Sequence, residues 1–154
     1  PSTFWKNGHR STMTNYRSDV PDGPWVIWYP NSDQIQEQGF HQDGIKEGLT
    51  TYYYKDGKMQ REGFFKNGLP DGKWTYWNAK GEKDFDFDFG TGLEQVALEN
   101  VPVDDDDDLF YKIGSEIPFT GILTYSNNDT GEEFLGRVKD GKKDGFNSIP
   151  KKIA

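Results

Sequence analysis

The stretch that decides the fold runs from residue 48 to residue 81 and reads GLTTYYYKDGKMQREGFFKNGLPDGKWTYWNAKG. It contains one complete copy of a short motif and the start of the next. Each copy opens on a glycine, continues into a cluster of aromatic residues, and turns at a second glycine. Further aromatic residues and another glycine turn follow. A pattern that recurs in this way indicates a repeat architecture.

The glycines that open the copies recur along the chain. They are separated by 25, 24, 49 and 24 positions and are Gly23, Gly48, Gly72, Gly121 and Gly145. We therefore predict about five to six copies with a period of about 24 residues. The spacing of 49 indicates that the regular pattern is broken once, between residues 90 and 108.

Each copy has the residues of two short strands and a tight turn. Asp56-Gly57 and Asn67-Gly68 can supply the positive φ angles of hairpin turns, and residues 58–65 between them have the length of one strand. A single hairpin is marginal in water, so stability must come from neighbouring copies. The sequence predicts an all-β protein, an elongated single-layer antiparallel sheet of successive β-hairpins.

The break in the pattern suggests three parts within one continuous repeat domain. Residues 1–92 and 109–154 are predicted to form hairpin repeats, and residues 93–108 an acidic linker or insertion. Within that insertion, LEQVALEN (residues 93–100) is the one segment expected to form a helix, of about two turns. Just before it, residues 84–89 alternate Asp and Phe, so an extended strand places three Phe on one face and three Asp on the other.

Composition narrows the function classes. Aromatic residues reach 16% and glycines number 18, while hydrophobic residues make up only 32%, so the core must consist of rings packed over glycine-rich turns. No stretch approaches the roughly 18 apolar residues of a membrane span, and none is expected. There is no cysteine, which excludes disulfides, thiolate catalysis and cysteine-ligated zinc. His9 and His41 are expected at surface turns, and no metal site or cofactor is predicted.

The net charge of −8 is concentrated in one segment. Residues 84–108 contain ten acidic residues and no Lys or Arg, which leaves 18 basic against 16 acidic residues elsewhere. Since no basic stripe stands out, nucleic acid is not an expected partner.

The chain opens PSTFWKNG, without Met and without the charged and apolar segments of a signal peptide. We therefore expect that it starts inside a longer sequence or after processing. The compartment stays open between the cytoplasm and, if a signal was removed, the periplasm or envelope.

Several sequence segments resemble the MORN (membrane occupation and recognition nexus) repeat, in the bacterial variant of YwqK-type antitoxin proteins. They are DGKWTYWNAKGE, GLTTYYYKDGKMQREGFFKNG, DGIKEG and IPFTGILTYSNNDTGE. The resemblance covers about residues 4–89 and 109–145, and departs at Asn31-Ser32, in the Asp–Phe run and throughout residues 90–108. It implies a sheet of hairpins without catalytic residues and, for the bacterial members, neutralisation of a toxin by binding. Eukaryotic members are linked to membranes, a role that an acidic chain would serve poorly.

Three rings are candidate binding residues. Trp28, Tyr53 and Trp77 lie five positions after the opening glycine in three successive copies. Rings in a row on a sheet can bind a protein or a sugar. The alternative is that they form the structural ladder that holds the copies together.

The acidic residues are the second set of candidates. They are Asp84, Asp86, Asp88, Asp104, Asp105, Asp106, Asp107 and Asp108. Three alternatives stay open: a Ca²⁺ site, although no spaced Ca²⁺ loop is matched, a solvated linker, or a surface that binds a basic partner.

We predict a non-enzymatic, protein-binding repeat module that acts as an antitoxin or immunity protein on a basic toxin. The chain has no G-x-S-x-G, H-E-x-x-H or phosphate loop, although a carboxylate pair for glycoside hydrolysis stays open. One alternative is a carbohydrate- or envelope-binding module that uses the rings, and another is a structural scaffold. Exposed sheet edges can also mediate self-association.

Overall fold

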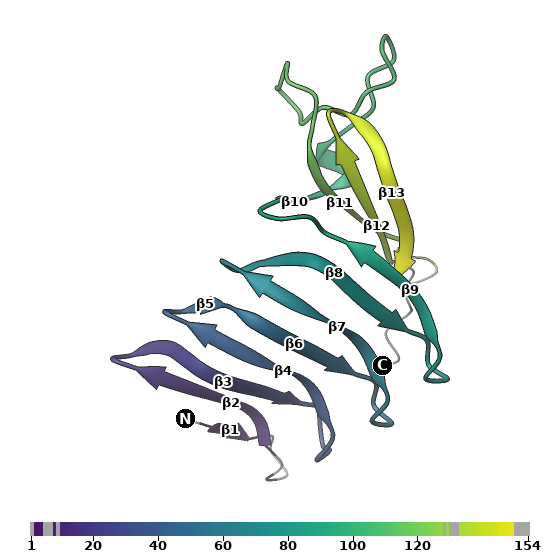
Figure 1. Cartoon of the computed structure of the whole chain (residues 1–154). Helices are drawn as coiled ribbons and strands as arrows, with labels where there is room; N and C mark the ends of the chain where they lie inside the picture. The colour runs from purple at the N-terminus through teal and green to yellow at the C-terminus, as the bar shows by residue number, and fades with distance from the viewer. Residues whose placement is uncertain (1, 5–7, 9, 128, 130–132, 150–154) are drawn as a thin grey trace. The chain divides into compact units, whose positions relative to one another are not determined.

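The computed structural model describes residues 2–4, 8, 10–127, 129 and 133–149. Within these residues the protein is all-β, apart from one turn of 3₁₀ helix. The chain forms two compact units, the first ending at Gly92 and the second beginning at Leu93. The predicted fold class is confirmed for the first unit, an open antiparallel sheet of consecutive hairpins (Figure 1).

The sheet of the first unit follows the order of the chain. Its order is β1-β2-β3-β4-β6-β7-β8-β9, and the short β5 pairs with β4. The strands are β1 (Ser2–Phe4), β2 (Arg10–Arg17), β3 (Val20–Trp28), β4 (Ile35–Gln42), β5 (Ile45–Lys46), β6 (Gly48–Tyr53), β7 (Met59–Lys66), β8 (Leu69–Trp77) and β9 (Lys83–Asp88).

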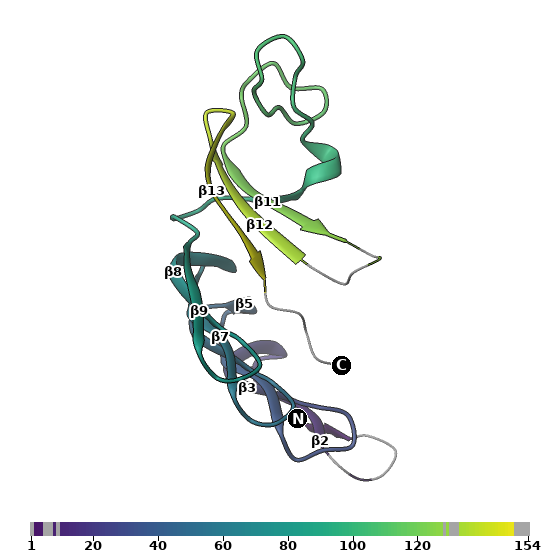
Figure 2. The ribbon, with the colours of Figure 1, turned by 90° about the vertical axis from the view of Figure 1, so that its right-hand side faces the viewer.

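The second unit has a smaller sheet with one parallel pair; Figure 2 shows its strands β11, β12 and β13 side by side. Its order is β10-β11-β12-β13, with β10 parallel to β11 and the other pairs antiparallel. The elements are β10 (Gln95–Ala97), the 3₁₀ turn η1 (Leu98–Asn100), β11 (Gly121–Ser126), β12 (Glu133–Lys139) and β13 (Lys142–Ile149). A small apolar core lies beneath them, formed by Val101, Phe110, Phe119, Leu123 and Val138.

The prediction of a helix at residues 93–100 is wrong. This segment forms β10 and then η1, whose N-cap residue Ala97 offers no side-chain cap. Two uncapped turns are marginal alone, whereas here Val96 and Leu98 pack against the core and β10 pairs with β11. Residues 93–108, expected as a linker, thus fold with the second unit and supply Val101 to its core.

The period of the first unit rests on contacts between indole rings and glycines. Trp25 is paired with Gly39, and its ring covers that glycine, so that an added Cβ would lie 2.9 Å from the ring. Trp74 covers Gly63 in the same way, and there a Cβ would meet three ring atoms at 2.2–2.3 Å. Glycine is required at both positions because any side chain would occupy the space of the indole.

A single cross-strand row explains why the middle copy departs from the pattern. The row runs Trp25, Gly39, Thr50, Gly63, Trp74, Phe87, and we call this side of the sheet the packed face. Thr50 stands where the flanking copies have Trp. Because the Trp25 ring already covers Gly39 and the Trp74 ring covers Gly63, no glycine is left for a third indole.

Tyrosine hydroxyls link each copy to the next. Tyr29 donates a hydrogen bond to the carbonyl of Tyr53 (2.6 Å), and Tyr54 donates to the carbonyl of Trp77 (2.7 Å). The third copy has Asn78 at this place, and its side-chain oxygen instead accepts from backbone amides of its own turn. The tyrosine ladder therefore ends at Asn78.

The predicted alternation of residues 84–89 is confirmed for the phenylalanines. Phe85 stacks on Tyr76 with ring centres 4.6 Å apart, and Phe89 packs edge-on against both Trp74 and Phe87. All three Phe thus extend the packed face. Asp84 is the extra residue of a bulge, since Trp77 pairs with Lys83 and Tyr76 with Phe85.

Four hairpins turn through two residues that both have positive φ. These loops are Ser18-Asp19, Asp43-Gly44, Asn67-Gly68 and Asp140-Gly141. Positive φ at both positions is the type I′ geometry, which matches the twist of the flanking strands. The first loop alone lacks glycine, so it is the strained one of the four.

Replacing Gly63 by Ala should destabilise the protein by about 3 kcal/mol, because the new Cβ overlaps a rigid indole. Urea denaturation measures this loss. The double variant Gly63→Ala/Trp74→Thr should lose less than the sum of the two single variants, since Thr is accepted in this row at position 50. A Gly63→Ala variant as stable as the parent would contradict the ring-over-glycine packing.

Asp19→Gly should stabilise the protein by about 0.5–1 kcal/mol. The φ of 67° at Asp19 costs a non-glycine residue about 1–2 kcal/mol, and the added freedom of glycine in the unfolded chain offsets part of that gain. The matched control is Lys55→Gly, at an exposed turn position without positive φ. There the added chain freedom should only destabilise. Equal effects of the two substitutions would argue against strain in the first turn.

Candidate functional site

The side of the first sheet opposite the packed face, which we call the open face, carries a polar row. Paired neighbours across the strands place Val26, Gln38, Thr51, Glu62, Thr75 and Asp86 in this row. Within it, Thr51 donates a hydrogen bond to Glu62 and Thr75 donates one to Asp86, both of 2.9 Å. The row therefore largely satisfies its own polar groups.

The three candidate rings lie on this open face. Trp28, Tyr53 and Trp77 each lie two residues beyond a member of the polar row, and all are half-buried. The hydroxyl of Tyr53 accepts a hydrogen bond from the Gln38 amide (3.0 Å), and the Arg10 guanidinium lies 5.9 Å from the centre of the Trp28 ring. The tyrosine ladder uses the backbone carbonyls of Tyr53 and Trp77 but not their rings, and the ring-over-glycine contacts use other side chains, which leaves these three rings partly accessible.

The carboxylates of the Asp–Phe run find partners within the chain. Asp86 accepts hydrogen bonds from Lys83 (2.7 Å) and Thr75, and Lys73 lies 3.7 Å away. These hydrogen bonds hold the pKa of Asp86 below its usual value. Asp88 caps the backbone amide of Gly90 (2.8 Å), and Asp84 is exposed. Lysines of the same sheet thus offset part of the negative charge of this strand.

Sequence reasoning missed an apolar row on the open face. Phe40, Leu49 and Phe64 are exposed there, with Leu49 directly paired to Phe64. Phe40 belongs to the neighbouring strand β4, where its carbonyl accepts a hydrogen bond from the amide of Glu47, two residues before Leu49 (3.0 Å). The signal was present, since each Phe follows a glycine of the packed face and must point the other way.

The run of five aspartates forms the tip of a hairpin in the second unit. Val103 and Phe110 form an antiparallel bridge, and the amide of Asp104 donates to the carbonyl of Leu109 (2.8 Å). The carboxylate of Asp104 accepts from the amide of Asp106 (2.8 Å), and that of Asp107 from the amide of Leu109 (2.9 Å). The run is a folded loop, in which aspartates cap their own backbone.

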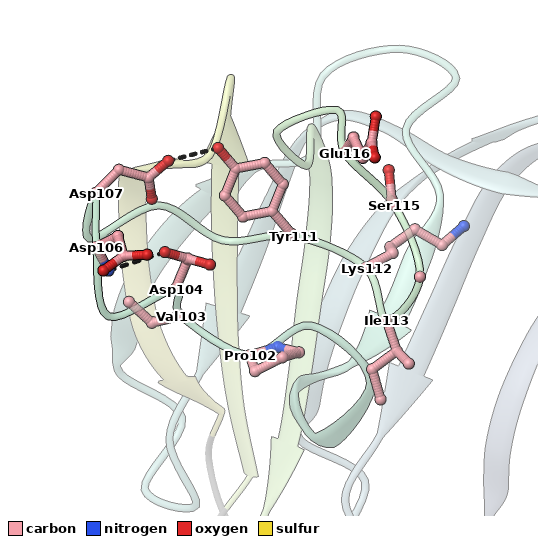
Figure 3. Close-up of a pocket in the computed structure, with 11 residues that line it drawn as sticks. Pro102, Val103, Asp104, Asp106, Asp107, Tyr111, Lys112, Ile113, Ser115 and Glu116 are labelled. Carbon is pink, nitrogen blue, oxygen red and sulfur yellow. Dashed lines mark hydrogen bonds between the residues drawn. The ribbon is translucent and has the colours of Figure 1, made fainter.

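A pocket of about 600 Å³ lies beside this hairpin, and Figure 3 shows its lining. Tyr111 spans one side and donates a hydrogen bond of 2.6 Å to Asp107, which raises the pKa of the tyrosine hydroxyl. Asp104, Asp106 and Glu116 add further carboxylates to the lining.

The rim of this pocket combines negative charge with exposed aliphatic side chains. Ile113 lines the pocket and is 71% exposed, and Ile117, just beyond its lining, is 77% exposed. Residues 102–117 hold six acidic residues and one basic residue. That residue, Lys112, is paired with Glu94 at 3.1 Å.

Neither a metal centre nor a membrane span is found in the part of the chain that the structure describes. No three His, Asp or Glu side chains there are grouped so that they could hold a metal ion, and the Ca²⁺ alternative gains no support. No helix among the described residues is long and apolar enough to cross a membrane.

The structure divides the predicted site residues into two sets. Trp28, Tyr53, Trp77 and the aspartates of residues 84–88 belong to the sheet of the first unit. Asp104 to Asp108 form one loop of the second unit. Each set is a separate candidate surface.

Acidification should test the contacts of Asp86. Its folded pKa lies below its unfolded value near 3.8, so its stabilisation is full above that pH and is lost as the pH falls through the folded pKa. In Asp86→Asn, the free energy of unfolding should therefore fall less between pH 5 and pH 2, by circular dichroism. Asp84→Asn, which removes an exposed carboxylate of the same strand, is the control for the loss of one charge.

Comparison with known proteins found no match among family models, curated proteins or solved structures. The resemblance to MORN repeats thus stays a prediction that depends on the residues of the copies. The role of the chain has to be inferred from its own surfaces.

Proposed function

We propose that this chain is a non-enzymatic, protein-binding module that holds a basic segment of its partner in the pocket of the second unit. The observation that carries the proposal is the rim of that pocket, where isoleucines stand exposed to water beside several carboxylates. Burying one aliphatic side chain of this size contributes about 1.5–3 kcal/mol, so a partner that covers Ile113 and Ile117 gains substantially.

The chemistry of the rim favours Lys and Arg as the bound side chains. Both have an apolar stem that can lie along an aliphatic side chain and a cationic head that can reach a carboxylate. Ile113 and Val103 offer the first kind of contact, and Asp104, Asp106 and Glu116 the second. The pocket is therefore complementary to a basic, amphipathic peptide segment.

Net charge adds long-range attraction to this contact. From residue 93 onward the sequence has 13 acidic and 7 basic residues. Such an imbalance steers a basic partner toward the surface and raises its association rate, by an amount that falls with salt. The MORN-like resemblance suggests a toxin as this partner, so we propose antitoxin or immunity activity as the specific role.

A carbohydrate- or envelope-binding role is the second candidate. It is favoured by the half-buried rings of Trp28, Tyr53 and Trp77, which recur at one place of three successive copies on the open face. Flat rings with one polar edge suit the faces of sugars as well as protein side chains. This candidate uses the first unit, so the two roles can be tested separately.

Replacing Asp104 to Asp108 by Asn should slow association with a basic partner captured from the source organism about tenfold at low salt and flatten its salt dependence. Asn keeps the side-chain oxygens that cap the hairpin, so the fold should persist. Stopped-flow association measures the rate.

Ile113→Ser should instead raise the dissociation rate and leave the association rate nearly unchanged. The matched control is Trp28→Ala, which should alter neither rate but should reduce retention on glycans if the second candidate is right. Association kinetics that are unchanged in the Asn variant would contradict the proposed basic partner.

A further inference from the structure

Four hydrogen-bond donors gather on the packed face of the first unit, around Gly39. Trp25 is paired with Gly39, and His41, two residues further along β4, is paired with Lys46. The position of a Cβ on Gly39 would lie 2.7 Å from Oγ1 of Thr50 and 3.1 Å from Cε2 of Trp25, the carbon bonded to Nε1. The His41 ring centre lies 5.6 Å from that of Trp25.

This position of His41 corrects the expectation that it lies in a surface turn. It is a half-buried residue of β4 that faces a tryptophan and a lysine. Burial and the Lys46 charge lower its pKa. His9, expected in a turn as well, lies outside the described residues.

None of the polar atoms at the centre of this group has a hydrogen-bond partner among the described residues. They are Nε1 of Trp25, Nδ1 of His41 and Oγ1 of Thr50. Trp25 is only 3% exposed and Thr50 is fully buried. Nearly all buried polar groups in proteins are paired, because an unpaired one loses its bonds to water without replacement. Two orphan donors on such buried side chains therefore call for an explanation.

The ammonium of Lys46 lies above the same group. It is 4.8 Å from the centre of the Trp25 ring and 5.2 Å from that of Phe65. In the part of the chain that the structure describes, no carboxylate forms an ion pair with it. The cluster of Trp25, His41, Lys46 and Thr50, which we call the donor cluster, thus has a positive charge and no facing anion.

The next copy shows that the fold does not require these donors. There Trp74 covers Gly63 as Trp25 covers Gly39, but the residues 24 positions after His41 and Lys46 are Phe65 and Pro70. Phe65 packs edge-on against Trp74, with ring centres 5.2 Å apart. The Trp74 indole donates to the carbonyl of Phe64 (3.1 Å), so this indole N–H, unlike that of Trp25, is paired. The surroundings of the indole ring are thus apolar in one copy and rich in hydrogen-bond donors in the other.

We propose that the donor cluster binds a small oxyanion, the carboxylate or phosphate group of a ligand. An oxyanion is acceptor-only, so it can satisfy the indole N–H and the hydroxyl, and also the imidazole in the tautomer that carries its proton on Nδ1, while it neutralises Lys46. The orphan atoms are covered in the free protein, so a side chain above them has to move as the oxyanion enters. Lys46, which is held by ring contacts, is the side chain to which we assign this movement. This site lies in the first unit and is independent of the pocket proposed above for a protein partner.

The indole N–H resonances of the full chain provide the test. The protein, labelled with ¹⁵N, is titrated with sodium acetate and separately with sodium phosphate, at constant ionic strength set by sodium chloride. The Trp25 resonance, assigned by its loss in Trp25→Phe, should shift saturably, and the Trp74 resonance, already hydrogen-bonded, should not. A response to acetate alone identifies a carboxylate ligand, and a response to phosphate identifies a phosphate ester.

Two variants separate binding from structure. Lys46→Gln should weaken the titration at least tenfold, whereas Lys66→Gln, which changes an exposed lysine of the same sheet, should leave it unchanged. Thr50→Val removes a buried orphan hydroxyl, so it should raise the melting temperature of the free protein and abolish the rise caused by the oxyanion.

Three results would each overturn the proposal. One is a Trp25 shift that chloride reproduces, and another is an equal shift of Trp74. The third is a titration that Lys46→Gln leaves unaltered.

Discussion

The contact of an indole ring with a glycine on the neighbouring strand is the constraint on which the first unit depends. A single-layer sheet has no second sheet to bury its apolar residues, so the rings must lie flat along the sheet. Trp25 and Trp74 do this only because Gly39 and Gly63 have no side chain in the space that the rings occupy. The period of about 24 residues is the distance along the chain between these two glycines.

That constraint also sets what the other side of the sheet presents. Because side chains alternate, a residue next to a packed-face glycine must point to the open face. Phe40 and Phe64 follow the two glycines and stand exposed for this reason. The open face thus combines an apolar row, a polar row and a row of rings.

The sequence was sufficient where structure is local. Hairpin turns, the alternation of residues 84–89 and the repeat period depend on neighbours within about 25 positions, and these predictions agree with the structure. The insertion was different, because β10 pairs with β11 in parallel, joining Gln95 to Ile122 across the acidic hairpin. Helix propensity in residues 93–100 gives no hint of that distant partner.

The candidate surfaces show the same limit. The period alone located Trp28, Tyr53 and Trp77, whereas the capping role of Asp104 to Asp108 depends on a loop geometry that a plain acidic run does not reveal. The donor cluster is less visible still. Trp25 and Thr50 look like ordinary members of a repeat, and only the three-dimensional surroundings show that their polar atoms lack partners.

The end of the tyrosine ladder has a consequence for how such a chain can grow. Tyr29 and Tyr54 each reach forward to the backbone of the following copy, so every copy that carries the tyrosine accepts a successor. Asn78 folds its side chain back into its own turn and makes no such bond. Tandem duplication of residues 48–71 would add a copy that both receives and donates the bond. For the tyrosine bonds, the number of copies therefore depends on the residue at one position. On the packed face, however, the first Gly63 of such a duplicated chain would lie between two threonines, without an indole ring to cover it.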